Sequence, residues 1–449
     1  MINKIAVLEE TIIKLAEAKK YASLRDFLAT LNPADIAEAF GAVSDQSLPL
    51  VFRLLPKELA AETFVEMETE QQEILIRGFS DSELKAVVEE LYVDDAVDLV
   101  EEMPANVVSR ILAQADPDTR KMINNILKYP EDSAGSVMTT EMVELQGRMT
   151  AAEAIAHIRK VGVDKETINT CYITGRTHKL KGVISIRSLI LADPEALCQD
   201  LMTPSVVSVN TLEDQETVAQ MFSKYNFNAL PVVDGDNRLL GIVTMDDAMD
   251  IMEEEATEDM EKMAAMTPSD RPYLSTGVFD IFKQRVPWLL FLMIAATITG
   301  YIIMGFKDVL VGSAILIAYI PLLMDTGGNS GSQTSVTVIR GLSLQEVEFQ
   351  DIFRVIWKEF RVALLCGITL SALIFGKLML LDGQELMVAL AVSLALLCTI
   401  VLAKIVGCTL PILAKRVGFD PALLASPIVT TIVDIVSLLI YILLISAIL

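Results

Sequence analysis

The sequence predicts a multidomain membrane protein: an α-helical superhelical N domain, a doubled α/β domain and an all-α transmembrane domain of five helices. Three observations predict it. Helix-start signals recur every 24 residues near the N-terminus, a strand–helix–strand pattern occurs twice in the middle, and long apolar stretches fill the last third. The expected domains are residues 1–132, 133–252 and 279–449, with an acidic connecting helix in 245–278.

The N-terminal region repeats a short helical unit. An apolar residue stands before Pro, or before Ser/Asp followed by Glu, and these residues favour a helix start. Two short helices per repeat would stack into a solenoid of the armadillo kind, and such solenoids are usually scaffolds. The four repeats begin at Leu31-Asn-Pro-Ala-Asp, Leu55-Pro-Lys-Glu, Phe79-Ser-Asp-Ser-Glu and Met103-Pro-Ala-Asn.

A second repeat follows with a different pattern. Gly135-Ser-Val-Met-Thr-Thr and Asp200-Leu-Met-Thr-Pro-Ser are each followed by an amphipathic helix, which begins near Thr150 or Thr211. Each copy then gives strand, turn and strand, ending in Leu180-Lys-Gly-Val-Ile-Ser or Leu239-Leu-Gly-Ile-Val-Thr. This order resembles a tandem pair of CBS (cystathionine-β-synthase) modules.

The charge of the chain is unevenly distributed. The formal net charge is −24, yet residues 286–449 hold 9 Lys/Arg and 10 Asp/Glu. Nearly all the excess carboxylate therefore precedes the apolar part, much of it in the connecting helix after Met245. Such a surface repels nucleic acid and attracts cations, although many soluble domains are acidic merely for solubility. The five cysteines include no CxxC pair, and the two histidines do not stand at zinc-ligand spacing with them.

Five apolar stretches are long enough to span a bilayer: 287–306, 309–339, 360–381, 386–414 and 421–448. Basic residues gather before the first stretch, between the second and third, and after the fourth. By the positive-inside rule the N-terminal domains are cytosolic and the C-terminus is outside. No signal peptide is expected, because charges run through the first 25 residues.

Two segments within the spans carry polar groups. Asp434 lies about halfway along the last span, where a carboxylate is costly unless it faces water, a cation or a partner. It predicts an ion site with the hydroxyls of Thr430 and Thr431; the alternative is a protonated Asp bonded to one of these hydroxyls. In the second span, Asn329 and Gln333 offer neutral oxygens beside three glycines, which would also suit close helix packing.

Three segments resemble the motifs of the MgtE family of bacterial magnesium channels and transporters: Asp325-Thr-Gly-Gly-Asn-Ser-Gly-Ser-Gln, residues 420–434, and Glu255-Ala-Thr-Glu-Asp259. The resemblance follows the whole chain in domain order. It implies a Mg²⁺-selective channel or transporter that takes up Mg²⁺ down its electrochemical gradient as a homodimer in the bacterial cytoplasmic (inner) membrane. Asp434 of both subunits would hold hydrated Mg²⁺, which prefers one or two carboxylates plus waters.

The resemblance also implies that cytosolic Mg²⁺ closes the pore through the connecting helix, called the plug helix in the family. Regulatory Mg²⁺ would bind carboxylates of the N domain, the CBS pair, the plug helix and the pore mouth. Asn226 and Ser426 stand where the family pattern has an acid and an Asn. By motif the regulatory sites fall on Glu62, Asp94, Asp98, Asp214, Glu216, Asp247, Asp250, Glu255, Glu258, Asp259 and Asp420.

Other functions remain as alternatives. CBS pairs often bind adenine nucleotides, and Thr244 and Asp247 have GxxTxxD spacing from Gly241, so ATP is a possible ligand of the CBS pair. A transporter of an osmolyte or anion would want basic residues in the spans, where Lys404 is the clear one. A membrane enzyme is disfavoured, because no nucleophile–base pair has suitable spacing. The expected partners are the lipid bilayer, Mg²⁺ and a second copy of the chain, with no nucleic acid.

Overall fold

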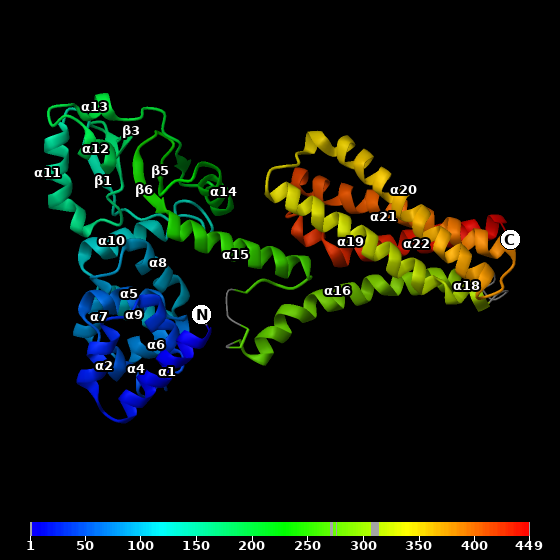
Figure 1. The fold of residues 1–449 in the computed structure, drawn as a ribbon, viewed down its shortest axis with the longest axis horizontal. Helices are drawn as coiled ribbons and strands as arrows, with labels where there is room; N and C mark the ends of the chain where they lie inside the picture. Colours follow the sequence, from blue (N-terminus) through cyan, green and yellow to red (C-terminus); the bar gives the residue numbers. More distant parts are fainter. Residues whose placement is uncertain (1, 270–272, 275, 307–313, 449) are drawn as a thin grey trace. The chain divides into compact units, whose positions relative to one another are not determined.

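The computed structural model describes residues 2–269, 273–274, 276–306 and 314–448 (Figure 1). These residues form two compact units, Met1–Ile251 and Met252–Leu449. The first unit contains short helices followed by two small sheets, and the second contains long apolar helices. This architecture confirms the predicted fold class of a multidomain membrane protein.

Short helices fill residues 2–126. The helices that begin at Pro33, Lys57, Asp81 and Ala105 start 24 residues apart, in agreement with the repeat seen in the sequence. The helices are α1 (Ile2–Glu17), α2 (Tyr21–Leu28), α3 (Pro33–Phe40), α4 (Leu48–Phe52), α5 (Lys57–Val65), α6 (Thr69–Gly78), α7 (Asp81–Val88), α8 (Val93–Glu102), α9 (Ala105–Gln114) and α10 (Pro117–Ile126).

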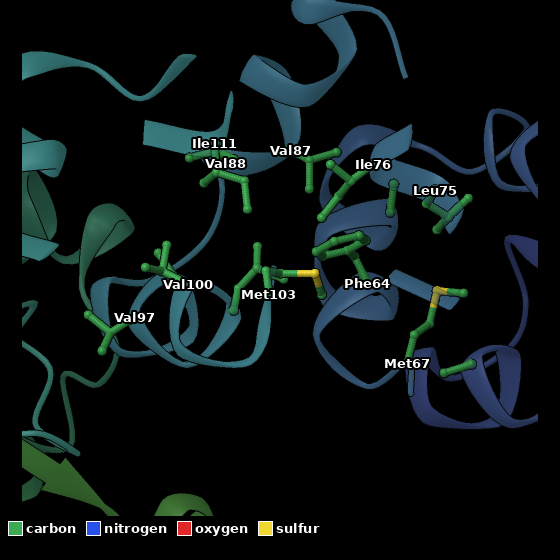
Figure 2. Packing of buried hydrophobic residues seen from close by; sticks show 14 of the residues in the cluster. Phe64, Met67, Leu75, Ile76, Val87, Val88, Val97, Val100, Met103 and Ile111 are labelled. Carbon is green, nitrogen blue, oxygen red and sulfur yellow. The ribbon is translucent and has the colours of Figure 1, made fainter. Parts of the chain in front are cut away.

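Capping interactions and a shared hydrophobic core stabilise these helices. Ser80 and Glu83 form a capping box at the start of α7, which satisfies two backbone N–H groups that the helix itself leaves unpaired. Each short helix buries one apolar stripe against its neighbours. Figure 2 shows this core, where Phe64, Val88 and Ile111 come from different repeats and are almost fully buried.

Two sheets of the same topology follow. The first has β1 (Val143–Gln146) parallel to β2 (Thr170–Thr174), and β2 antiparallel to β3 (Leu180–Ser185). The second repeats this order with β4 (Val209–Asn210), β5 (Ala229–Val233) and β6 (Leu239–Thr244). The connecting helices are α11 (Ala151–Val161), α12 (Ile186–Leu191), α13 (Cys198–Leu201) and α14 (Gln215–Tyr225), with a 3₁₀ turn, η1 (Gly162–Asp164).

The two sheets exchange backbone hydrogen bonds. Thr139, just before β1, pairs with Ile242 of β6, with N···O distances of 2.8 and 2.9 Å. Thr203, just before β4, pairs in the same way with Val183 of β3, at 2.9 and 3.1 Å. Each module therefore completes the other, as the doubled sequence pattern suggests.

The acidic connecting helix, α15, runs from Met245 to Met263. The helix stops well before the end of the expected 245–278 segment, because Ala265 adopts a left-handed conformation (φ 54°) that a helix cannot contain. Part of the expected 245–278 segment, residues 270–272 and 275, lies outside the described residues.

Four helical segments in the described residues are long and apolar enough to cross a membrane: Val278–Gly305 (α16), Phe349–Leu380, Leu386–Val417 (α21) and Ala422–Ile448. The second combines η2 (Phe349–Asp351) with α20 (Ile352–Leu380), and the fourth combines η3 (Ala422–Leu424) with α22 (Ser426–Ile448). The remaining expected span corresponds to α18 (Ala314–Ala318) and α19 (Ile320–Ser343); residues 307–313 before it are not described.

Helix α19 differs from the four apolar helices in composition. Its 24 residues would cover about 36 Å at the α-helical rise, which is enough to cross a bilayer. Its middle is rich in Gly, Ser and Thr, which explains why hydropathy alone does not select it. It packs against both α21 and α22, so these three helices form the centre of the second unit (Figure 1).

Candidate functional site

One edge of α19 carries polar side chains. Asp325, Asn329 and Gln333 are each four residues apart, so they lie on one face of the helix, and all three are exposed on the single chain. The opposite side contains Gly327, Gly331 and other buried residues that pack against α21 and α22. A polar edge on a helix among apolar helices marks a surface that cannot rest against lipid.

Glycines bring α19 directly against α22. A Cβ on Gly328 would lie 2.7 Å from Cγ2 of Thr430, and one on Gly327 would lie 3.0 Å from Oγ of Ser437. Atoms at such distances clash, so only glycine permits this approach. The sequence interpretation of the glycines as a packing face agrees with these contacts, which place Thr430 beside the glycine segment.

Asp434 lies on the α22 side of this contact. Its Oδ1 is buried and accepts no hydrogen bond from the described residues, and Asp325 of α19 is the charged group that acts on it. Thr431 donates its hydroxyl to the backbone oxygen of Pro427, 2.8 Å away, rather than to the carboxylate. The sequence leaves open that Asp434 is protonated and bonded to one of the two threonine hydroxyls. The structure does not contain that bond for Thr431. The side chain of Ser426 is outside the described part.

A second acidic group lies near the C-terminal end of α15. Lys262 places its ammonium 2.6 Å from Glu258 and 2.7 Å from Asp420, which precedes η3. Burial and the charge of Asp420 raise the pKa of the neighbouring Asp259 to about 6. Three of the predicted regulatory carboxylates therefore meet here, together with a lysine that sequence reasoning did not single out.

The first unit contains a larger cluster of carboxylates. Asp94, Asp95 and Asp98 of α8 face Asp247, at the start of α15, and the charge of Asp247 helps to raise the pKa of all three. For Asp94 burial is the main cause, since this residue is only 6% exposed, and its pKa lies well above the usual range. The structure thus brings together Asp94, Asp98 and Asp247 as the motif comparison implies.

Sequence reasoning missed part of this cluster. Burial, with Asp95 and Asp246, raises the pKa of Glu166 to about 8, and one oxygen of Glu166 is buried without a hydrogen-bond partner among the described residues. Glu166 lies in the loop between η1 and β2, where nothing in the local pattern distinguishes it from a surface acid. Only the packing of the first CBS module against α8 reveals it.

The other predicted regulatory residues differ in their surroundings. Glu62 is exposed on α5 and is not among the charges that act on Asp94 or Asp98. Asp214 caps α14 by accepting the backbone N–H of Glu216 at 2.9 Å. Asn226 ends that helix in a left-handed conformation (φ 53°), which Asn adopts readily and which accounts for its place there. Asp250 and Glu255 lie on α15, where the charge of Asp250 acts on Asp247 and that of Glu255 acts on Asp259.

The possible nucleotide residues contact each other. Thr244 is buried at the end of β6 and donates its hydroxyl to Asp247 at 2.5 Å, while its backbone N–H donates to the same oxygen at 3.2 Å. This pair fixes the turn from β6 into α15. Asp247 therefore belongs both to the GxxTxxD pattern and to the carboxylate cluster.

The grouping of these carboxylates in pairs suits a divalent cation that keeps part of its water shell. Among the described residues no three His, Cys, Asp or Glu side chains converge to hold one metal ion. Burial and neighbouring acids raise the pKa values of Asp94, Asp95 and Asp98, and no basic side chain of the described residues is among the groups that act on them. Mg²⁺ commonly keeps several waters and uses one or two carboxylates, so pairs such as Asp94 and Asp247 suit this ion better than a closed metal cage would.

Comparisons with known proteins agree with this arrangement. Family models match at residues 320–444 (MgtE, divalent cation transporter), 31–132 (MgtE intracellular N domain) and 198–254 (CBS domain). The magnesium transporter MgtE of Thermus thermophilus is 37% identical over 96% of this chain and 97% of its own length. That of Bacillus subtilis is 32% identical, covering 96% of both chains.

Solved structures match the N-terminal half. The cytosolic domain of the Mg²⁺ channel MgtE in complex with ATP is 36% identical, with a TM-score of 0.51 over 54% of this chain and 99% of that one. The soluble part of a magnesium transporter is 28% identical, with a TM-score of 0.53 over 56% and 99%. The chain belongs to the MgtE family of divalent cation transporters.

Proposed function

We propose that this chain carries Mg²⁺ into the cell through a path lined by α19 and α22, and that Asp434 is the carboxylate that binds the passing ion. Membership of a family of divalent cation transporters supports transport rather than enzymatic catalysis. The names of the relatives, magnesium transporters in two bacteria, support Mg²⁺ as the substrate.

The observation that carries the proposal is the state of Asp434. Its Oδ1 is shielded from solvent in a membrane helix, has no hydrogen-bond donor among the described residues and lies near a second carboxylate, Asp325. Such a group is unfavourable unless a cation or water completes it. A hydrated Mg²⁺ supplies both positive charge and donor waters.

The conducting unit is proposed to be a homodimer. The polar edge of Asp325, Asn329 and Gln333 is exposed on one chain and would be unfavourable against lipid. Two copies that meet along α19 and α22 would cover these edges and enclose a polar path between them. Asp434 would then be present twice, once from each subunit.

Orientation follows from charge. Arg340, Lys358 and Lys415 lie at one end of the spanning helices, with further basic residues beside them. By the positive-inside rule this end, and with it the N-terminal domains, lies in the cytosol of a bacterial cell and the C-terminus lies outside. Inward flow of Mg²⁺ then needs no energy source beyond the membrane potential.

Closure by cytosolic Mg²⁺ is part of the proposal. The carboxylates around Asp94 and Asp247, and those around Asp259 and Asp420, are held together against their mutual repulsion. Mg²⁺ bound there stabilises the compact arrangement, and its loss destabilises it. Each ion shifts the balance only by its difference in affinity for the two states, so two clusters acting together give a steeper response.

Nucleotide binding is a second candidate function for the CBS pair. A structure with 36% sequence identity was solved in complex with ATP. Thr244 and Asp247 of the second module keep the GxxTxxD pattern. ATP should therefore raise the melting temperature of the wild-type protein, and Thr244→Val should reduce that rise.

The test of transport uses purified protein in liposomes with a fluorescent Mg²⁺ indicator inside. Wild-type protein should admit Mg²⁺ when the inside is negative, and Asp434→Ala should abolish the flux. Asp280→Asn is the matched control, since Asp280 is an exposed carboxylate paired with Lys283 at the start of α16. Unchanged flux in the Asp434 variant would refute the proposed ion site. Chloride flux instead of Mg²⁺ flux would favour the anion alternative.

A further inference from the structure

Three polar side chains from three helices meet inside the membrane unit. Lys404 of α21 donates its ammonium to the hydroxyl of Thr334 of α19 at 3.1 Å, and that hydroxyl donates to the carboxylate of Glu359 of α20 at 3.0 Å. The ammonium and the carboxylate are themselves 3.8 Å apart. Thr334 therefore links the two opposite charges in one continuous chain of contacts.

This group, Lys404–Thr334–Glu359, is almost completely enclosed. The side chain of Lys404 is 7% exposed and that of Glu359 is 16% exposed, while Thr334 as a residue is 3% exposed. Lys404 and Asp94 are the only buried charged residues in the described part of the chain. A buried ammonium is costly, and pairing with a carboxylate offsets only part of that cost, so an apolar residue would serve stability as well or better.

The location of the group suggests what it does. Gly331, one turn before Thr334, contacts the backbone of α21: a Cβ on Gly407 would lie 2.3 Å from the oxygen of Gly331, and one on Gly331 would lie 3.2 Å from the oxygen of Ala403. Lys404 is the next residue along α21. Backbone contact and charged contact therefore fix the same face of α19 against α21.

Because a helix turns as one body, holding this face of α19 against α21 also sets the direction in which the opposite, polar edge of α19 points. Successive residues of an α-helix are about 100° apart, so a turn of α19 by one position would bury Asn329 and Gln333 and expose its glycines. Close glycine packing alone sets the distance between two helices, whereas a hydrogen bond to a side chain also sets the rotation. Thr334 is the described residue of α19 that holds a buried charged pair.

We propose that Lys404, acting through Thr334 and Glu359, is a positioning residue that holds α19 in the rotation at which Asp325, Asn329 and Gln333 face the ion path. This inference rests on the proposed function, since it assigns the path to that edge of α19. The proposal also accounts for Lys404, the single lysine deep in the spans, without requiring an anion path. The charge of Lys404 is balanced by Glu359 and is enclosed between helices.

The experiment compares four proteins: wild type, Lys404→Met, the neutral pair Lys404→Met/Glu359→Gln, and the charge-exchanged pair Lys404→Glu/Glu359→Lys. Each is also made with Gln333→Cys after the five native cysteines are replaced by Ser. Three quantities are measured: melting temperature, Mg²⁺ flux with its half-saturating concentration, and the rate at which a charged, membrane-impermeant methanethiosulfonate modifies the thiol at 333.

If Lys404 positions α19, Lys404→Met lowers flux and thiol modification by about tenfold or more, as small misplacements of a site commonly do. The neutral pair removes the unpaired charge and regains the melting temperature but not the flux or the modification rate. The charge-exchanged pair regains all three. Only a positioning role separates stability from function in this way.

Two results would overturn the inference. One is a neutral pair that regains wild-type flux and half-saturation, which would make the charges a matter of folding alone. The other is an unchanged modification rate at 333 in Lys404→Met. If wild-type protein itself carries no Mg²⁺ in these liposomes, the proposed function has failed, while the thiol rates still report whether α19 has turned.

Discussion

The ammonium of Lys262 lies 2.7 Å from the carboxylate of Asp420 and 2.6 Å from that of Glu258. The chain therefore supplies its own cation at a group of acids that the family resemblance assigns to Mg²⁺. A lysine and a divalent ion that share the same carboxylates compete for them, so the lysine sets how strongly the metal-free arrangement is held.

Replacing Lys262 with Gln should loosen the metal-free protein near the end of α15. Chymotrypsin offers a measurement, because Tyr273 and Leu274 are 70% and 95% exposed. Since pairs of this kind contribute about 0.2–1 kcal/mol, cleavage there without Mg²⁺ should become up to about fivefold faster. Saturating Mg²⁺ should restore the wild-type rate. Lys283→Gln is the control, and equal rates for both variants would contradict the prediction.

Neutralising Asp94 should have two opposite effects. Asp94→Asn replaces a buried carboxyl group, whose charged form burial and Asp247 disfavour, with a permanently neutral amide, so the metal-free protein should melt at a higher temperature. The same change removes a Mg²⁺ ligand, so millimolar Mg²⁺ should raise that temperature less than in wild type. Glu62→Gln serves as the comparison, since Glu62 is exposed on α5, away from the cluster. A smaller Mg²⁺ effect in Glu62→Gln than in Asp94→Asn would move the ligand to α5.

Raising the pH should destabilise the metal-free protein. Burial and neighbouring acids raise the pKa of Asp95 to about 7 and that of Glu166 to about 8, whereas such groups titrate near 4 in an unfolded chain. Between these values the folded chain binds more protons than the unfolded chain, so the free energy of unfolding falls as the pH rises.

In EDTA the melting temperature should therefore drop between about pH 4 and pH 8, by roughly 2–4 °C for each kcal/mol lost. Mg²⁺ should cancel most of the drop, because it stabilises the charged carboxylates. Asp98 should contribute less than Glu166, since Asp98 is exposed to solvent and water screens its charge. A melting temperature that rises over this range would contradict the carboxylate cluster.

Adding one methyl group at Gly407 should disrupt the membrane unit. The new Cβ would lie 2.3 Å from the backbone oxygen of Gly331, so α19 and α21 would have to separate. We expect Gly407→Ala to lose Mg²⁺ flux and to cost about 1–3 kcal/mol of stability. Gly376→Ala in α20 is the matched control: nothing lies within 4 Å of its new Cβ, and helix propensity favours Ala. Loss of flux in both would point to a general sensitivity of these helices.

Part of the fold and part of the candidate site could be predicted from the sequence. The spacing of Pro33, Lys57, Asp81 and Ala105 appears directly in the chain because each helix start depends on a few local residues. The motifs also single out Asp434 and Asp420, and their roles stay predictions. By contrast, Glu166, Lys262 and Glu359 are ordinary charged residues in their local segments. Their roles depend on which distant acid or base lies opposite, and packing alone decides that.

Hydropathy shows the same limit in the membrane part. Among the described residues, four helical segments are apolar enough for a span, while α19 is not, because its Gly, Ser and Thr residues serve contacts with other helices. The sequence places a span there only through the apolar residues that precede Pro321. A helix that combines polar side chains with close helix contacts is the one that hydropathy describes least well.

The reciprocal pairing of Thr139 with Ile242 and of Thr203 with Val183 has a mechanical consequence. Each sheet borrows a segment that belongs to the other module, so pulling the modules apart would break backbone bonds on both sides at once. A pair joined in this way should move as one rigid body, so that any ligand bound to one module would displace both together.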